Sequence, residues 1–247
     1  MNKRLYCLTL IEYRRYFDAI NPSDSFKYQI NTCIERIMWG RNQYLAVEAE
    51  TGVPWVFVAL IHEMECDCDF SRQILNGQKI DEMTTIEPKG HGPWRFWNTS
   101  AIEGVQRYSL IKNWSVGEIG YYLEKHNGFG YRNAGLLSPY LFSGCQWGID
   151  LGLYTKDGTY DPLKESLQAG AYVLLSELIK RELYMEPVAV EWPVQYMSRN
   201  DTVMSFQIFL NSSFGAGLHM DGVAGAKTSE AYKNQTGQYL IGDPRSL

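Results

Sequence analysis

The sequence predicts a mainly helical protein with one short β-hairpin region and a small helical module at its C-terminal end. Three observations predict this class. Apolar residues recur at helical spacing in the segments 26–50, 54–65 and 162–183. Residues 71–100 are rich in glycine, proline, threonine and asparagine, which is typical of hairpin and loop. The segment 184–195 has two prolines and no helical period, and it precedes a short remainder with its own helices.

The composition bounds the classes of function. A chain of 247 residues with 45% hydrophobic residues has room for one large domain and a small appendage. The formal charge of −5 gives no basic surface, so we expect no nucleic-acid partner. No segment approaches the roughly 20 apolar residues of a membrane span, and the charged start does not resemble a signal peptide. Five scattered cysteines indicate reduced thiols.

The segment 54–65 is predicted to be the buried central helix. It begins with Pro54, which is favoured in the first turn, and it is apolar nearly all round as far as Ile61. A polar stretch with the strong turn signal Asn76-Gly77 follows directly. Later, Ser115 and Glu118 form a capping box at the start of a helix over 115–127. This order places the end of the central helix opposite a hairpin, and we expect a cleft there.

Four carboxylates and two thiols stand at the end of the central helix, in the string "IHEMECDCDF" over 61–70. Burial, neighbouring carboxylates and the negative end of the helix dipole all raise the pKa of a carboxyl group. Such an acid can protonate the leaving oxygen of a glycosidic bond. Glu63 and Glu65 both continue apolar rows of the helix, so the pattern alone does not choose between them. A helix that ends in a solvated acidic loop is the alternative without function.

Metal binding and nucleophilic catalysis are weaker interpretations. Cys66 and Cys68 stand one residue apart, whereas zinc sites usually pair cysteines as Cys-x-x-Cys, and the four histidines form no helical pair. We therefore expect no metal and no cofactor. Cys145, in "FSGCQWG", has no histidine or asparagine in a supporting motif. The glycines of "GFGYRNAG" lack the preceding strand that a dinucleotide fingerprint needs.

Seven strings together resemble phage and bacterial proteins of the lysozyme and lytic-transglycosylase superfamily, in the family's order and over about residues 12–182. They are "EYRRYFD", "NQYLAVEAETGVPW", "ALIHEMECDCDFSRQILNG", "TTIEPKGHGP", "YLEKHNGFGYR", "SPYLFSG" and "GLYTKDGTYDP". The resemblance implies a lysozyme-like α+β catalytic domain with a small β-hairpin region over 1–187. In the family pattern an isoleucine-histidine pair and two further residues precede a catalytic glutamate and a serine, so the resemblance chooses Glu65, with Cys66 in place of the serine.

The chain departs from the family at the turn after the central helix. The family usually continues the Asn-Gly turn with an aspartate, and this chain has Gln78 there. If that aspartate positions water, another group must take its place. Thr84, Thr85 and Asp81, on what we expect to be the next strand, are the candidates, because a hydroxyl can hold a water without being a base. The change to cysteine at position 66 alters the hydrogen bonding near the acid.

The resemblance also implies substrate-binding residues, which are Asn76, Gln78, Asn127 and Tyr131. The string "EKHNGFGYR" resembles the tyrosine-asparagine motif of lytic transglycosylases, with His126 in the place of the tyrosine. Asn127 offers a donor and an acceptor to an acetamido group, and Tyr131 offers a ring face to a pyranose. Asn127-Gly128 is equally readable as the end of a helix.

The tail resembles a peptidoglycan-binding module over 195–247. Its string "MDGVAGAKTSEAYK" carries Asp221-Gly222 as a turn and Thr228 or Ser229 as a cap for the following helix. We expect a small separate core formed by six residues: Phe206, Phe209, Leu210, Leu218, Tyr232 and Tyr239. The resemblance implies attachment to the cell wall, without naming contact residues.

The expected function is therefore a peptidoglycan-degrading muramidase, an endolysin or virion-associated lysozyme, that cuts the β-1,4 bond between N-acetylmuramic acid and N-acetylglucosamine with Glu65 as general acid. Two alternatives remain open: a lytic transglycosylase that acts on the same bond, and a phage structural or wall-binding protein that keeps the fold without cutting. The expected partners are peptidoglycan glycan strands, with phage tail or virion proteins as a second class. The expected location is the host cytoplasm with pore-dependent delivery to the wall, or the virion.

Overall fold

The computed structural model describes residues 3–111, 114–149, 151–156, 159–185, 194–236 and 239–246. The chain divides into two compact units, which are Tyr16–Glu186 and a unit made of Met1–Arg15 with Pro187–Leu247. The sequence predicts instead that residues 1–15 belong to the large domain. The linker expected at 184–195 lies mostly outside the described residues. The assignment of a catalytic domain to 1–187 and a wall-binding module to 195–247 stays a prediction.

Helices dominate both units, which confirms the prediction of a mainly α protein. The described residues form the α-helices α1 (Lys3–Asp18), α2 (Lys27–Trp39), α3 (Arg41–Thr51), α4 (Trp55–Cys66), α5 (Trp97–Val105), α6 (Val116–Asn127), α7 (Gly130–Asn133), α8 (Pro139–Phe142), α9 (Ala171–Lys180), α10 (Asp201–Phe214) and α11 (Ala226–Thr236). They also form the 3-10 helices η1 (Asp24–Phe26), η2 (Gln106–Tyr108), η3 (Gln146–Gly148) and η4 (Pro244–Ser246), and the strands β1 (Leu153–Lys156) and β2 (Thr159–Asp161).

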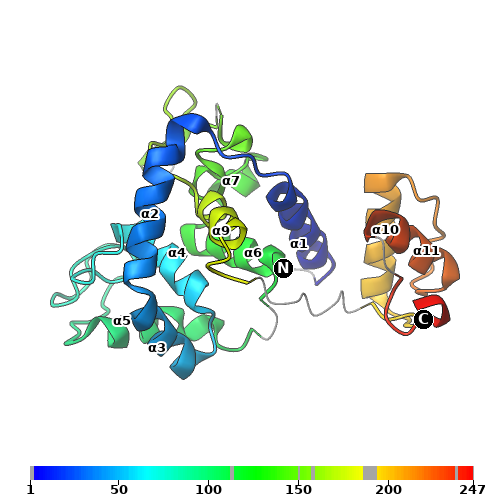
Figure 1. The fold of residues 1–247 in the computed structure, drawn as a ribbon, viewed down its shortest axis with the longest axis horizontal. Helices are drawn as coiled ribbons and strands as arrows, with labels where there is room; N and C mark the ends of the chain where they lie inside the picture. The colour runs from blue at the N-terminus through cyan, green and yellow to red at the C-terminus, as the bar shows by residue number, and fades with distance from the viewer. Residues whose placement is uncertain are drawn as a thin grey trace. The chain divides into compact units, whose positions relative to one another are not determined.

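Helix α4 is the buried centre of the larger unit, as the sequence predicts. Every residue from Trp55 to Met64 is buried. The helices α2, α3, α6 and α9 pack against it (Figure 1). Pro54 stands directly before the first helical residue, so the predicted start signal is confirmed. A helix that is apolar nearly all round needs neighbours on every side, and these four helices supply them.

Two of the predicted helices are shorter than their patterns. The segment 26–50 is divided at Gly40 into α2 and α3. A side chain at Gly40 would collide with the rings of Tyr44 and Phe70, so the chain approaches closely there. The segment 162–183 is helical only from Ala171 to Lys180. A side chain at Gly170 would collide with the backbone carbonyl of Leu141, so the chain approaches closely there before the helix starts.

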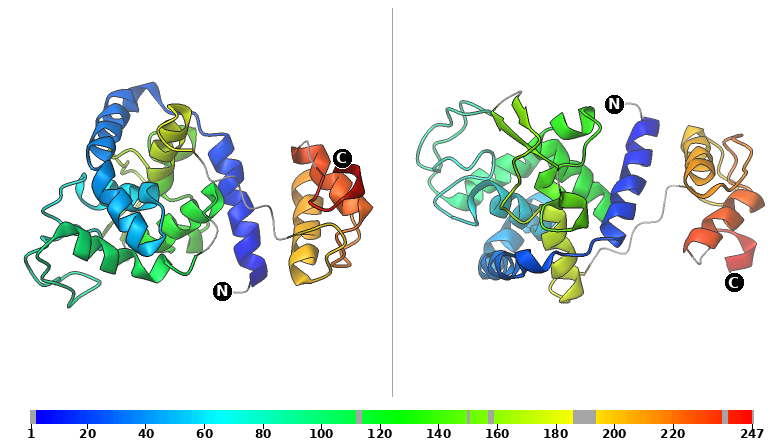
Figure 2. Two further views of the ribbon diagram at one scale, coloured as in Figure 1. Left: turned by 60° about the horizontal axis from the view of Figure 1, so that its bottom comes forward. Right: turned by 90° about the horizontal axis from the view of Figure 1, so that it is seen from above.

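The hairpin expected after α4 is an irregular loop that runs from residue 67 to residue 96, drawn in cyan to green in Figures 1 and 2. One antiparallel bridge joins Arg72 to Lys79 around the Asn76-Gly77 turn, and Thr84, Thr85 and Asp81 lie in loop and not on a strand. The two-stranded antiparallel sheet lies later, where Leu153 pairs with Asp161. The tight turn predicted at 157–158 lies outside the described residues. Side-chain hydrogen bonds, described below, hold the loop in place of a strand ladder.

The smaller unit is called the C-terminal unit below, because most of it is Pro187–Leu247. It has its own apolar core under α10 and α11. Phe206, Leu210 and Leu218 are buried in it as predicted, and Tyr232 packs against it. The side chain of Phe209 lies outside the described residues. Tyr239 is only half-buried, and its ring lies 4.3 Å below both the Lys233 ammonium and the Arg245 guanidinium.

The Asp221-Gly222 turn of this unit forms as predicted, with Gly222 at a φ of +71°. The Asp221 side chain accepts hydrogen bonds from the Val223 amide and from Gln207. Thr228 and Ser229 lie inside α11 and do not cap it, because the helix already begins at Ala226. The sequence pattern set the cap too late in the chain.

No helix among the described residues is long and apolar enough to cross a membrane.

Candidate functional site around Glu65

The candidate site is built at the C-terminal end of α4. Asp67 and Cys68 both adopt left-handed backbone, with φ of 56° each, and this reverses the chain immediately after Glu65. The Asp67 amide donates to the carbonyl of Glu63, which closes the last turn. Gln168 caps the same helix end, because its side-chain amide donates to the carbonyls of Glu63 (3.3 Å) and Met64 (3.1 Å). The end of α4 is therefore held from two directions.

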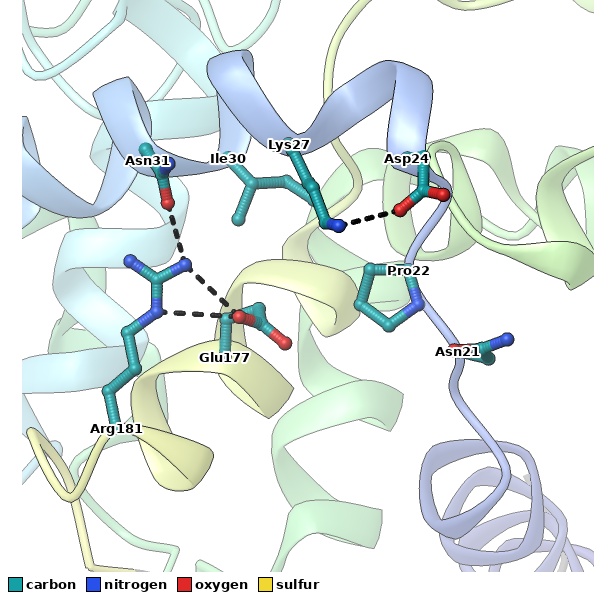
Figure 3. Close-up of a pocket in the computed structure, with 8 residues that line it drawn as sticks. All are labelled: Asn21, Pro22, Asp24, Lys27, Ile30, Asn31, Glu177 and Arg181. Carbon is teal, nitrogen blue, oxygen red and sulfur yellow. Dashed lines mark hydrogen bonds and ion pairs between the residues drawn. The ribbon is translucent and has the colours of Figure 1, made fainter.

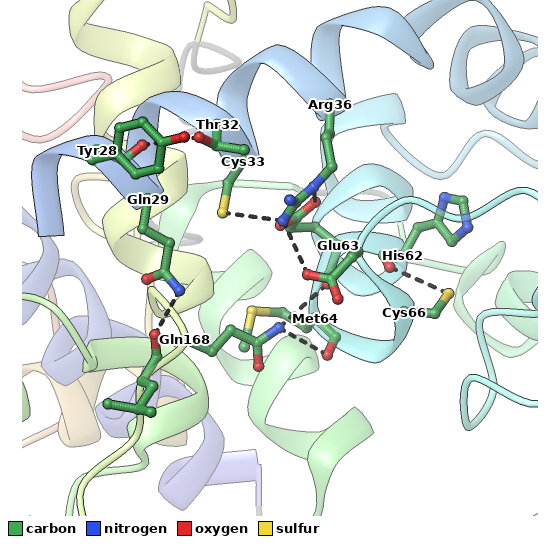
Figure 4. A network of polar contacts seen from close by, with 12 residues as sticks. Tyr28, Gln29, Thr32, Cys33, Arg36, His62, Glu63, Met64, Cys66 and Gln168 are labelled. Atoms are coloured by element: carbon green, nitrogen blue, oxygen red, sulfur yellow. Dashed lines mark hydrogen bonds and ion pairs between the residues drawn. The ribbon is translucent and has the colours of Figure 1, made fainter.

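Glu63, the first of the two candidate acids, is committed to an ion pair. Its side chain is fully buried, and both carboxylate oxygens accept hydrogen bonds from the Arg36 guanidinium of α2 (Figure 4). Arg36 also reaches Asp67 at 3.0 Å. The bidentate pair holds α2 to α4 and compensates the buried charge of Glu63. The residue pattern left the choice between Glu63 and Glu65 open, and this pairing gives Glu63 a structural role.

Glu65 has a different environment. Its side chain is 20% exposed, and the Tyr140 hydroxyl of α8 donates to Oε1 over 3.3 Å. Burial raises the pKa of Glu65 to about 7, and the hydrogen bond from Tyr140 offsets only part of this effect. Glu65 is therefore about half protonated near neutral pH and can act as a proton donor.

His126 of α6 lies on the other side of the same carboxyl group. Its side chain is 2% exposed, and its Nε2 atom is 3.6 Å from Oε1 of Glu65. Burial, with the nearby Arg107 charge, lowers the pKa of His126 to about 3. The ring is thus neutral at working pH, and it adds a polar contact to Glu65 without adding a charge. The sequence indicates His126 only as a substitute for the tyrosine of the tyrosine-asparagine motif.

The turn after α4 lies directly against the backbone of Glu65. A side chain at Gly77 would collide with the backbone carbonyl of Glu65, and the φ of +71° at Gly77 also favours glycine. The Asn76 side chain donates to the carbonyl of Ile86 at 2.8 Å. Gln78 donates from Nε2 to the Thr85 hydroxyl and accepts from the amides of Thr85 and Ile86 through Oε1. Asn76 and Gln78 therefore brace the loop beside Glu65.

The three candidates for positioning water differ in how free their side chains are. The Thr84 hydroxyl is buried, donates to the carbonyl of Pro88 at 2.7 Å and accepts from the His91 amide at 2.9 Å. Both of these hydrogen bonds are made within the loop. Thr85 is exposed and bonded to Gln78, and Asp81 is exposed.

The two remaining candidate ligands are held in different surroundings. Asn127 is exposed at the last position of α6, directly after His126, and Gly128 follows it with a φ of +94°, so the helix-end interpretation is confirmed. Tyr131 is buried against the sheet, where its hydroxyl accepts from the Tyr154 amide at 2.9 Å. The structure therefore brings Asn127 next to a residue that contacts Glu65, whereas the hydrogen bond of Tyr131 is with β1.

The thiols near the acid are packing residues in this arrangement. Cys66 directs Sγ to the carbonyl of His62 at 3.5 Å, back along α4. Cys68 and Cys145 are buried, burial raises the pKa of each, and the four cysteines whose side chains are described are free. Among the described residues, no group of three histidines, cysteines or carboxylates is placed to hold a metal ion.

A separate groove lies between the residues around η1 and helix α9 (Figure 3). Its charged groups pair with one another: Lys27 contacts Asp24 at 2.7 Å, and Arg181 contacts Glu177 at 3.1 Å. None of the residues predicted to bind or cleave substrate lines this groove. The titratable cluster around Glu65 is therefore the better candidate site.

Two residues that position the acid were not predicted. Tyr140 lies in the quoted string "SPYLFSG", and Gln168 lies in a segment with a helical pattern. Only the packing of α8 and of the segment before α9 brings them to the end of α4.

Comparison of the chain with protein-family models, with curated proteins and with solved structures finds no match. The site is therefore interpreted from its own chemistry.

Proposed function

We propose that the protein is a muramidase-type glycosidase with a lysozyme-like larger domain, and that it cleaves the β-1,4 bond between N-acetylmuramic acid and N-acetylglucosamine in peptidoglycan. The observation that carries this proposal is the contrast between two glutamates at the end of one helix. Arg36 pairs with Glu63, whereas burial raises the pKa of Glu65 to about 7. A carboxyl group that is protonated near neutral pH is what the cleavage needs.

In this mechanism Glu65 gives its proton to the glycosidic oxygen as the bond to the sugar carbon breaks. A water molecule then adds to that carbon and gives a proton back to the carboxylate of Glu65. Loss of the proton leaves a carboxylate, which the Tyr140 hydroxyl already faces at 3.3 Å. A hydrogen bond to the charged form lowers the energy of the product of proton transfer. A general acid works best when its pKa lies near the working pH, and about 7 meets this condition.

The second candidate, a lytic transglycosylase, is favoured by one feature of the site. Two-carboxylate glycosidases hold their acids about 5 to 9.5 Å apart. The turn beside Glu65 carries Gln78, whose amide bonds to Thr85 and Ile86, at the position where the family resemblance leads us to expect an aspartate. Attack by a hydroxyl group of the substrate itself needs no second protein carboxylate to act as nucleophile or to activate water. This reaction leaves a 1,6-anhydro sugar, so its product differs from that of hydrolysis.

The test is loss of turbidity of a purified peptidoglycan suspension, followed by mass spectrometry of the soluble products. We expect the wild type to clear the suspension and Glu65→Gln to lose at least a hundredfold in rate. Glu50→Gln, at an exposed glutamate on α3, is the matched control and should keep full rate. Products with free reducing ends would support the lysozyme reaction, and products with 1,6-anhydro ends would support the transglycosylase reaction. A folded wild type that binds wall but releases no fragments would refute both.

The proposed route to the substrate follows from the proposed function. The C-terminal unit attaches the protein to the wall, and the chain reaches the wall through a pore made by another protein or as part of a virion. Immunodetection of the chain in purified virions separates these routes. Its absence there would leave delivery from the host cytoplasm.

A further inference from the structure

His126 is held by neighbours that determine which ring nitrogen carries its proton. The guanidinium nitrogen Nη2 of Arg107 lies 2.9 Å from Nδ1 of the ring, and the Tyr108 hydroxyl lies 3.3 Å from the same atom. A guanidinium group can only donate hydrogen bonds. Nδ1 must therefore accept, and because the ring is neutral its single proton must be on Nε2.

The Nε2–H group of this tautomer is buried beside the acid. Among the described residues Nε2 makes no hydrogen bond of normal geometry, although it is 3.6 Å from Oε1 of Glu65. The carbonyl of Ile74 also faces the ring and favours a proton on it. A buried donor without a good partner costs free energy, so its presence in a folded protein calls for a functional explanation. Closing the gap to a normal hydrogen-bond length takes about 0.5 Å.

We propose that His126 is a positioning residue for Glu65: Arg107 holds the ring as the Nε2–H tautomer, and this N–H bonds to the carboxylate that forms when Glu65 gives up its proton. The catalytic meaning rests on the proposed function, whereas the hydrogen bond is a property of the folded protein. The proton of Glu65 passes to the glycosidic oxygen, and His126 keeps its own proton throughout. The protonated acid attracts the N–H weakly and the carboxylate attracts it strongly, so the contact closes during the reaction.

The side chains that face this pair come from four elements, and the Ile74 carbonyl comes from the loop after α4. Glu65 comes from α4, Arg107 and Tyr108 from η2, His126 from α6, and Tyr140 from α8. Burial and the positive charge of Arg107 both lower the pKa of His126. Arg107 thus helps to keep the ring neutral as well as fixing the tautomer. A protonated ring would pair permanently with Glu65 and hold the acid in its ionised form.

The first test is nuclear magnetic resonance of the full-length protein with ¹⁵N-labelled histidine. We expect the His126 signals of the Nε2–H tautomer in the wild type. Arg107→Met should shift the population toward the Nδ1–H form. Arg95→Met is the matched control, because Arg95 is also exposed and also lies over an aromatic ring, 5.1 Å from the ring centre of Phe96. An Nδ1–H tautomer in the wild type would overturn the proposal.

The second test is titration of the Glu65 carboxyl carbon by ¹³C resonance, together with the pH dependence of the rate. His126→Phe should raise the pKa of Glu65 by about one unit, since the carboxylate loses a donor. It should lower kcat about tenfold with little change in KM. His126→Gln restores an N–H near the position of Nε2 and should recover both values.

The outcomes separate this inference from the proposed function. If His126→Phe folds and leaves the pKa of Glu65 unchanged, the positioning role is refuted. If His126→Phe does not fold, the comparison of Arg107→Met with Arg95→Met decides, and equal Glu65 titration curves would refute the role. A wild type that cleaves no glycan, while His126→Phe still raises the pKa of Glu65, would overturn the proposed function and support the hydrogen bond.

Discussion

Glu65 should cost the folded protein stability as the pH rises. Burial raises its pKa from 4.5 to about 7, so between these values the folded state binds a proton that the unfolded state has released. The contribution of Glu65 to stability is therefore highest below about pH 4.5 and is lost as the pH rises to about 7. This is opposite to the usual behaviour of a carboxylate with a lowered pKa. Integration of the proton uptake predicts a loss of about 0.8 kcal/mol at pH 5 and about 3.3 kcal/mol at pH 8.

The variant Glu65→Gln removes this titration and should flatten the dependence. Its free energy of unfolding should fall less than that of the wild type between pH 5 and pH 8, by about 2.5 kcal/mol. Urea unfolding followed by tryptophan fluorescence is the assay. Six of the seven tryptophans lie in the unit Tyr16–Glu186, so the signal reports mainly on the unit that contains the site.

Glu63→Gln is the matched control, and its effect on the free energy of unfolding should be opposite in sign to that of Glu65→Gln. It leaves the half-buried Arg36 guanidinium with only Asp67 as an ionic partner, and it should destabilise the unit by about 2 kcal/mol at both pH values. If Glu65→Gln loses stability between pH 5 and pH 8 as steeply as the wild type, Glu65 does not titrate near 7. Glu65 would then be ionised at neutral pH and could not serve as the proton donor.

Three further substitutions test the packing around the acid. Tyr140→Phe removes the donor to Oε1 and should raise the pKa of Glu65 by about half a unit to one unit, visible in the ¹³C titration; a lower pKa would contradict the hydrogen bond. Gly77→Ala should destabilise the protein by at least about 1 kcal/mol more than Gly52→Ala in urea unfolding, because both glycines have φ near +70° but only a side chain at Gly77 meets the Glu65 carbonyl. Gln168→Ala should cost about 1 kcal/mol in the same assay through loss of the cap on α4, and an unchanged midpoint would show that water replaces it.

Local patterns in the sequence determined the main elements of the site. The unbroken apolar run from residue 53 to residue 61 predicts a buried helix, and such a run can be stable only at the centre of a domain. Pro54 fixes its start, and Asn76-Gly77 fixes the turn that closes against its end. The capping box of Ser115 with Glu118 starts α6, and the Ser115 hydroxyl accepts from the Glu118 amide as predicted. These signals act over a few residues, so they can be recognised without a fold.

Tertiary contacts decided the chemistry of the two glutamates. Glu63 and Glu65 are two positions apart and have equivalent apolar rows, so their difference cannot be derived from periodicity. It arises because α2 presents Arg36 to Glu63, while α8 and α6 present Tyr140 and His126 to Glu65. The pKa of a carboxyl group depends on its burial and on the charges within a few ångströms, and those neighbours come from segments far away in the chain.

The length of regular structure was also decided by packing. The loop after α4 has the composition of a hairpin, yet the side chains of Asn76 and Gln78 satisfy backbone groups that a strand ladder would have paired. Residues 162–170 carry a helical pattern, but the close approach at Gly170 and the cap that Gln168 provides for α4 keep them out of a helix. Propensity sets a preference of less than about 1 kcal/mol per residue, and a few specific tertiary contacts exceed it.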